Sequence, residues 1–127
     1  MAIHKQTRTK KINAFVKETK KKMTDLGTYK IEFDTTIKRY AEMQLQYEIL
    51  NEKWLESGCA VTESYTNKSG ATNQRKTALY LSIESLRKEL LEIENIFGLT
   101  PKGLKAIKNK GLEQNKKSAL DKVLENV

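Results

Sequence analysis

The stretch from Thr77 to Phe97 constrains the fold of this chain most strongly. Six apolar residues recur through it at alternating intervals of four and three: Leu79, Ile83, Leu86, Leu90, Ile93 and Phe97. This spacing gives two seam positions in each heptad, so one helix can pack along another over several turns. A helix over 73–97 would be about 37 Å long, at roughly 1.5 Å of rise per residue. We therefore expect the rest of the chain to be organised around this helix.

The segment Tyr29–Glu56 predicts a second long helix, because it contains neither glycine nor proline and is followed by Gly58. Several of its apolar residues follow one seam: Phe33, Ile37, Tyr40, Tyr47 and Trp54. Met43, Leu50 and Leu55 widen the apolar surface beyond that seam. Because a helix that is apolar on more than one side usually packs on more than one side, we expect this helix to have several partners.

The residues between the two long helices have the character of a turn. Val61, Glu63 and Tyr65 occupy alternate positions, and residues 67–70 are rich in turn formers. This pattern predicts a short β-hairpin or an ordered loop. Either Thr72 or Asn73 is then the expected N-cap of the organising helix. The two helices and their connection would form an antiparallel helical hairpin.

The N-terminal segment predicts less regular structure. Residues 1–12 lack an amphipathic period and are expected to form a mobile basic arm. Asn13 is a candidate cap for a short helix over Ala14–Leu26, and Gly27 is a plausible stop for that helix.

The C-terminal segment contains a strong signal for a helix restart. Gly98 is a candidate cap at the end of the organising helix, and Thr100 followed by Pro101 favours a new helix over Pro101–Asn109. Gly111 is expected to break that helix. These signals divide the chain into a basic arm with a short helix (1–28), a helical-hairpin core (29–110) and a basic, partly flexible tail (111–127).

Both ends of the chain are basic. Residues 1–22 carry eight basic side chains against one acid, and residues 98–127 carry seven lysines against three acids, whereas the middle is balanced or acidic. Contact with a polyanion explains this distribution, and so does simple solvation of flexible ends. If the ends bind nucleic acid, we expect duplex rather than single strands, because Phe15 is the only aromatic residue in the first 28. The candidate DNA-contacting residues are Lys5, Arg8, Lys10, Lys11, Lys17, Lys20, Lys21, Lys22, Lys102, Lys105 and Lys108.

The sequence contains no grouping of residues that indicates catalysis. His4 and Cys59 are the single histidine and the single cysteine, and a protein-built zinc site needs three or four ligands. The glycines match no phosphate-binding fingerprint, and no apolar run approaches the length of a membrane span. We therefore predict a protein that is not an enzyme and that uses no cofactor, metal or membrane. With one cysteine, a reducing cytoplasm is the default location.

The heptad stripe has two interpretations that remain open. It can serve only to join the two helices of the hairpin, or it can also take part in oligomerisation. The broad apolar surface of the second helix favours the latter. The candidate core and interface residues are Phe33, Ile37, Tyr40, Tyr47, Leu50, Trp54, Leu79, Ile83, Leu86, Leu90, Ile93 and Phe97.

The end of the organising helix resembles a known family. It reads Phe97-Gly98-Leu99-Thr100-Pro101 and is followed by a short basic segment. A long helix that ends in this way resembles the small terminase subunits of tailed phages. Tyr40 and Tyr47 of the second helix and the polar turn at 67–70 agree with this resemblance, which covers about residues 30–108. The sequence departs from the family where Gln74, rather than proline, follows Asn73.

The resemblance implies an all-α subunit that assembles as a ring-type homo-oligomer. It also implies a non-catalytic role in genome packaging in the cytoplasm of a bacterial host, encoded by a phage or prophage. The implied partners are double-stranded viral DNA, other copies of the chain and the terminase large subunit, which holds the ATPase and nuclease. Two alternatives from other classes are a structural coiled-coil scaffold and a small DNA-binding transcription regulator.

Overall fold

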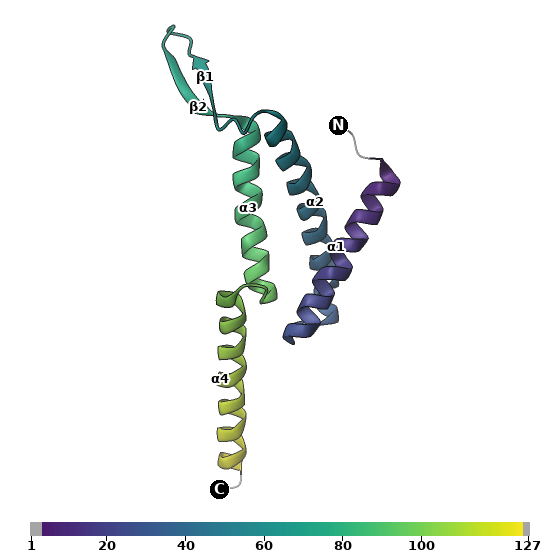
Figure 1. The fold of residues 1–127 in the computed structure, drawn as a ribbon. Helices are drawn as coiled ribbons and strands as arrows, with labels where there is room; N and C mark the ends of the chain where they lie inside the picture. Colours follow the sequence, from purple (N-terminus) through teal and green to yellow (C-terminus); the bar gives the residue numbers. More distant parts are fainter. Residues whose placement is uncertain (1–3, 126–127) are drawn as a thin grey trace.

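The computed structural model describes residues 4–125, and for residues 112–119, 122 and 125 it describes the backbone alone. The described chain is largely helical, with one small antiparallel hairpin (Figure 1). The elements in chain order are α1 (Lys5–Leu26), the 3-10 turn η1 (Ile31–Phe33), α2 (Asp34–Glu56), β1 (Thr62–Thr66), β2 (Thr72–Lys76), α3 (Ala78–Phe97) and α4 (Pro101–Glu125). This architecture confirms the expected helical hairpin with a β-hairpin at its turn.

The central helix of the described chain is α2, because both α1 and α3 pack against it. One core cluster takes residues from all three helices: Met23, Ile37, Tyr40, Leu90 and Phe97. The rings of Tyr40 and Phe97 pack edge to face, with ring centroids 5.7 Å apart. The stripe on α3 therefore packs as expected, but the organising position belongs to α2, whose broad apolar surface covers two partners.

Helix α1 begins much earlier than predicted. It starts at Lys5, so the mobile arm expected over 1–12 is wrong for its described part, and Asn13 lies inside α1 instead of capping it. Residues 1–3 lie outside the described residues. The first turn is capped by His4, whose Nδ1 accepts a hydrogen bond of 3.4 Å from the backbone N–H of Gln6.

The physical reason for the early start is a tertiary contact. Ile12 is 5% exposed and packs with Ala41 and Leu45 of α2. The local apolar pattern around Ile12 is too sparse to predict a helix, but its burial against α2 stabilises this turn. Gly27 does end α1, as predicted, with a φ of 78°.

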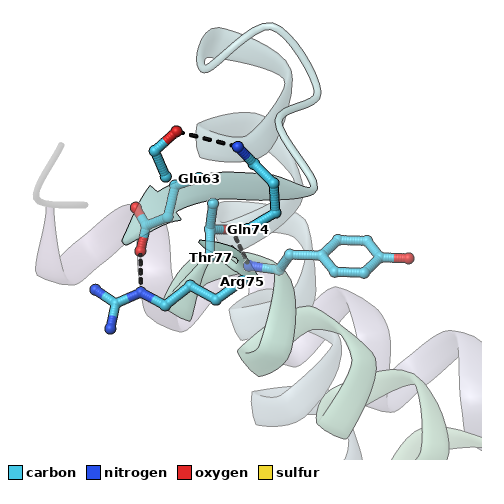
Figure 2. Close-up of polar contacts among 6 residues, drawn as sticks. Glu63, Gln74, Arg75 and Thr77 are labelled. Carbon is cyan, nitrogen blue, oxygen red and sulfur yellow. Dashed lines mark hydrogen bonds and ion pairs between the residues drawn. The ribbon is translucent and has the colours of Figure 1, made fainter. Parts of the chain in front are cut away.

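The hairpin displaces the expected start of α3. Residues 72–76 form β2, so neither Thr72 nor Asn73 caps the helix. Thr77 does so instead, and its side chain accepts a 3.1 Å hydrogen bond from the N–H of Tyr80 (Figure 2). The second helix likewise starts later than expected, at Asp34, after the 3-10 turn.

The corner between α3 and α4 forms as the sequence predicts. Gly98 takes the left-handed conformation at the end of α3, with a φ of 74°. The Thr100 hydroxyl accepts a 3.0 Å hydrogen bond from the N–H of Gly103 and therefore caps α4. The N–H of Leu99 closes the end of α3 on the carbonyl of Glu94, at 2.9 Å.

Helix α4 is longer than predicted. It continues through Gly111 to Glu125, so the expected end at Asn109 is wrong. A glycine inside a helix costs only about 1 kcal/mol relative to alanine, which helix-forming neighbours can offset. The flexibility expected for part of 111–127 stays a prediction, and residues 126–127 lie outside the described residues. None of the described helices is long and apolar enough to cross a membrane.

Candidate nucleic-acid interface and assembly surfaces

Helix α1 has an apolar face and, on its opposite side, a basic face. Its buried residues, Ile12, Thr19 and Met23, recur every seven or four residues and face the core. Lys10, Lys17 and Lys21 have the same spacing, and all three are exposed. At 100° per residue they lie on the opposite side of the helix, in a row about 16 Å long. We call Lys10, Lys17 and Lys21 the outer row.

Three other lysines of α1, which are Lys11, Lys20 and Lys22, have partners. Lys11 lies 3.3 Å from a carboxylate oxygen of Glu48 and Lys20 lies 3.6 Å from one of Asp34, so both reach toward α2. Lys22 instead pairs along its own helix with Glu18, at 3.2 Å. Such partly exposed ion pairs contribute only about 0–1 kcal/mol each. The outer row takes part in no ion pair found among the described residues.

The predicted DNA-contacting residues do not converge on one surface. Because α1 runs antiparallel to α2, its start lies toward the hairpin end of the bundle, as Figure 1 shows. Lys5 and Arg8 are exposed there. The predicted lysines of α4, which are Lys102, Lys105 and Lys108, are also exposed but follow Phe97 at the opposite end. To contact both basic segments, one duplex would therefore have to run along the length of the molecule. Otherwise each segment would contact a different stretch of DNA.

The predicted core and interface residues divide by burial. Five lie in the interior of the subunit, at 8% exposure or less: Ile37, Tyr40, Ile83, Leu90 and Phe97. The other seven are half-buried: Phe33, Tyr47, Leu50, Trp54, Leu79, Leu86 and Ile93. The first group forms the core that the heptad spacing predicts. A role for the second group between subunits stays a prediction.

A groove between α2 and α3 combines members of the second group with a residue that the sequence pattern missed. It has a volume of about 400 Å³ and is lined by Gln46, Leu50, Leu81, Ser82, Ser85, Leu86 and Glu89. We call it the leucine groove. Leu81 is 47% exposed and lies outside the heptad stripe, so the spacing of apolar residues did not single it out.

A second groove lies between α1, α2 and α3 and has polar groups in its walls. It measures about 490 Å³ and is lined by Phe15, Tyr40, Gln44, Tyr47, Glu48, Asn51, Leu90 and Glu94. We call it the polar groove. Desolvation raises the pKa of Glu94, and the charge of Lys22 partly opposes that shift. Burial raises the pKa of Tyr40 to about 12, with the charges of Glu94 and Glu18 adding to the effect.

The walls of the polar groove come from three helices packed together. Its one buried side-chain atom without a partner in the described chain is the Gln44 carbonyl oxygen. The described residues include no group of three histidine, cysteine or acidic side chains placed to hold a metal ion. The pKa shifts of Glu94 and Tyr40 arise mainly from burial between the helices, so they bear on the stability of that packing.

Comparison with known proteins gives one match. A family model described as phage terminase, small subunit, matches residues 13–114, which run from the first half of α1 into α4. Neither the curated proteins nor the solved structures contain a significant match. The matched segment contains the helical hairpin, the β-hairpin and the corner at Gly98.

Proposed function

The chain belongs to the family of phage terminase small subunits, and we propose that it is the non-catalytic DNA-recognition component of a genome-packaging motor. In this role it binds double-stranded viral DNA in the cytoplasm of the bacterial host. It delivers that DNA to the large subunit, which holds the ATPase and nuclease, and regulates it. This proposal assigns the chain no chemistry of its own.

The outer row of α1 is the observation that carries the proposal. Lys10, Lys17 and Lys21 present three exposed ammonium groups in a line, on the side of α1 that faces away from the core. Lysines that neutralise phosphates release counterions from duplex DNA, which supplies affinity without sequence preference. Lys10, which the sequence alone placed in a mobile arm, is thus held in the same packed helix as Lys17 and Lys21.

We further propose that the chain forms a ring-shaped homo-oligomer through the leucine groove. Leu50, Leu81 and Leu86 place apolar surface on the outside of the α2–α3 pair. A second copy of the chain is the occupant that the family membership favours. A ring requires a heterologous contact, so the surface that enters the groove lies elsewhere on the neighbouring subunit.

Two measurements on the purified chain test the proposal. Fluorescence anisotropy with a labelled duplex should show binding that weakens steeply as salt is raised, because several phosphates are neutralised. Mass photometry should show a discrete oligomer. Absence of duplex binding at low salt would contradict the DNA-recognition role and favour a scaffold. A strict monomer at micromolar concentration would contradict the ring.

A further inference from the structure

The β1–β2 hairpin stands away from the helices, at the end where α2 finishes and α3 begins (Figure 1). Every residue of both strands is exposed. Its base is nevertheless fixed to the bundle. The Lys76 ammonium lies 3.1 Å from Glu84 of α3, and the indole N–H of Trp54 donates a 3.1 Å hydrogen bond to the carbonyl of Ala60. The hairpin is therefore held in position while both of its faces are open to solvent.

One face of the hairpin is occupied by its own contacts. The register pairs Glu63 with Arg75 and Tyr65 with Asn73, so these four side chains share a face. The Arg75 guanidinium lies 3.1 Å from the Glu63 carboxylate, as Figure 2 shows, and 4.2 Å from the centre of the Tyr65 ring. These contacts stabilise the pairing of the strands and neutralise the charge of that face.

The opposite face carries only hydroxyl and amide groups over the outer part of the strands. It consists of Ser64, Thr66, Thr72 and Gln74, and we call it the polar face. The Gln74 amide donates a 3.1 Å hydrogen bond to the Ser64 hydroxyl, and the hydroxyls of Thr66 and Thr72 are 3.0 Å apart. Gln74 retains its carbonyl oxygen and a second N–H for an outside partner.

The chemistry of the polar face fits base edges better than another protein. Protein interfaces are centred on aromatic, methionine and arginine side chains, and the polar face has none of these. The major groove of duplex DNA admits a two-stranded β-ribbon. Glutamine can pair with adenine through two hydrogen bonds, hydroxyls can pair with any base, and threonine methyls can contact the methyl group of thymine.

The tip of the hairpin adds a positive charge in a fixed turn. The side-chain oxygen of Asn67 accepts 3.0 Å hydrogen bonds from the backbone N–H groups of Ser69 and Ala71. Lys68 lies inside this turn, is exposed, and forms no ion pair among the described residues. An ammonium at the tip of a ribbon is complementary to the phosphates that border a groove. The start of α1, with Lys5 and Arg8, lies at this same end of the bundle.

We propose that the β1–β2 hairpin enters the major groove and reads the DNA sequence through its polar face. Lys68 and the first turns of α1 contact the neighbouring phosphates. This inference rests on the proposed role in binding duplex DNA and adds to it the element that supplies sequence preference. It also makes the hairpin end of the bundle, rather than the α4 end, the end that recognises the site.

Selection from a pool of duplexes with a randomised centre tests the proposal with the full-length chain. Duplexes enriched by the wild-type protein are then compared with scrambled duplexes by fluorescence anisotropy. Replacing both Ser64→Ala and Gln74→Ala should lower the preference for the selected duplex about tenfold or more, while affinity for scrambled DNA stays within about twofold. Asn73→Ala, one residue away on the occupied face, is the matched control and should keep the preference. Circular dichroism checks that each variant is folded.

The outcomes separate this inference from the proposed function. A double variant that keeps the wild-type preference, or a wild-type protein that enriches no sequence while still binding duplexes, would overturn the role of the hairpin alone. A change in oligomeric mass with an unchanged sequence preference would also overturn it and would make the polar face a contact between subunits. Failure of the wild-type protein to bind any duplex at low salt would overturn the proposed function itself.

Discussion

The hydroxyl of Thr28 donates a 2.7 Å hydrogen bond to the backbone carbonyl of Phe97, and both residues are buried. This bond joins the turn after α1 to the last residue of α3. A side chain at Gly98 would place its Cβ only 2.9 Å from the Thr28 methyl group. Position 98 therefore requires glycine for two reasons: its φ is left-handed, and Thr28 approaches it closely.

Removal of this hydroxyl should destabilise the subunit. Thr28→Val keeps the shape of the side chain but leaves the Phe97 carbonyl without this donor, which should lower the free energy of unfolding by about 1–3 kcal/mol. The control is Thr24→Val, because the Thr24 hydroxyl donates within its own exposed turn, to the carbonyl of Lys20. Urea unfolding at a fixed protein concentration measures both variants. Equal effects of the two substitutions would contradict a special role for Thr28.

The two glycines of α4 should respond oppositely to the same substitution. A Cβ on Gly103 would overlap the carbonyl oxygen of Asn95 and lie 2.7 Å from its Cα, whereas a Cβ on Gly111 meets nothing within 4 Å. Gly103→Ala should therefore cost about 1–3 kcal/mol by forcing α4 away from α3. Gly111→Ala should stabilise the helix by about 0.5–1 kcal/mol. Thermal unfolding followed by circular dichroism compares them, and a neutral Gly103→Ala would argue against the close packing of this corner.

Features with a local cause were predicted from the sequence. The seam on α3 follows from heptad spacing, and the corner at Thr100 follows from a hydroxyl placed before a proline. Features with a tertiary cause were not predicted. The start of α1 depends on the burial of Ile12 against α2, and the need for Gly103 depends on the approach of Asn95. Neither contact can be predicted from the local pattern of charge or hydrophobicity.

The candidate site shows the same division. Counting lysines identified α1 as basic, but only the packed helix shows that Lys10, Lys17 and Lys21 share one face while Lys11 and Lys20 reach toward α2. A β-hairpin or an ordered loop was expected from the turn residues. Its polar face could not be assigned, because that face depends on the register of the two strands and a shift of one residue would exchange the faces.

Replacement of the outer row should reduce the salt dependence of duplex binding. The triple variant Lys10→Ala, Lys17→Ala, Lys21→Ala should lower the slope of log affinity against log salt by about 0.9 for each phosphate that is no longer neutralised. The control removes the same charge from α2 and the turn before it, through Lys30→Ala, Lys38→Ala and Lys53→Ala, all exposed. Anisotropy titrations at several salt concentrations measure both. Equal slopes for the two triple variants would show that net charge matters and the row does not.

The polar groove should make stability depend on pH through Glu94. Desolvation raises the pKa of Glu94 in the folded state, so the folded protein favours the protonated form. This contribution to stability is fully present below the ordinary glutamate pKa and is lost as pH rises through the raised value. Glu94→Gln should therefore flatten this step and raise stability at neutral pH, by well under about 1 kcal/mol because the group is partly exposed. Exposed Glu92→Gln is the control, and urea unfolding across the acid-to-neutral pH range compares the two; identical pH profiles would contradict the effect.

The leucine groove should control assembly. Leu81→Lys puts an ammonium on its rim, where docking of a neighbouring subunit would desolvate the charge, so the oligomer should dissociate toward lower mass. Leu91→Lys is the control, because Leu91 is similarly exposed, at 53% against 47%, but does not line that groove. Neither leucine belongs to the buried core, so both variants should remain folded by circular dichroism. Mass photometry reads the outcome: an intact oligomer for Leu81→Lys, or dissociation by Leu91→Lys alone, would move the subunit contact to another face of α3.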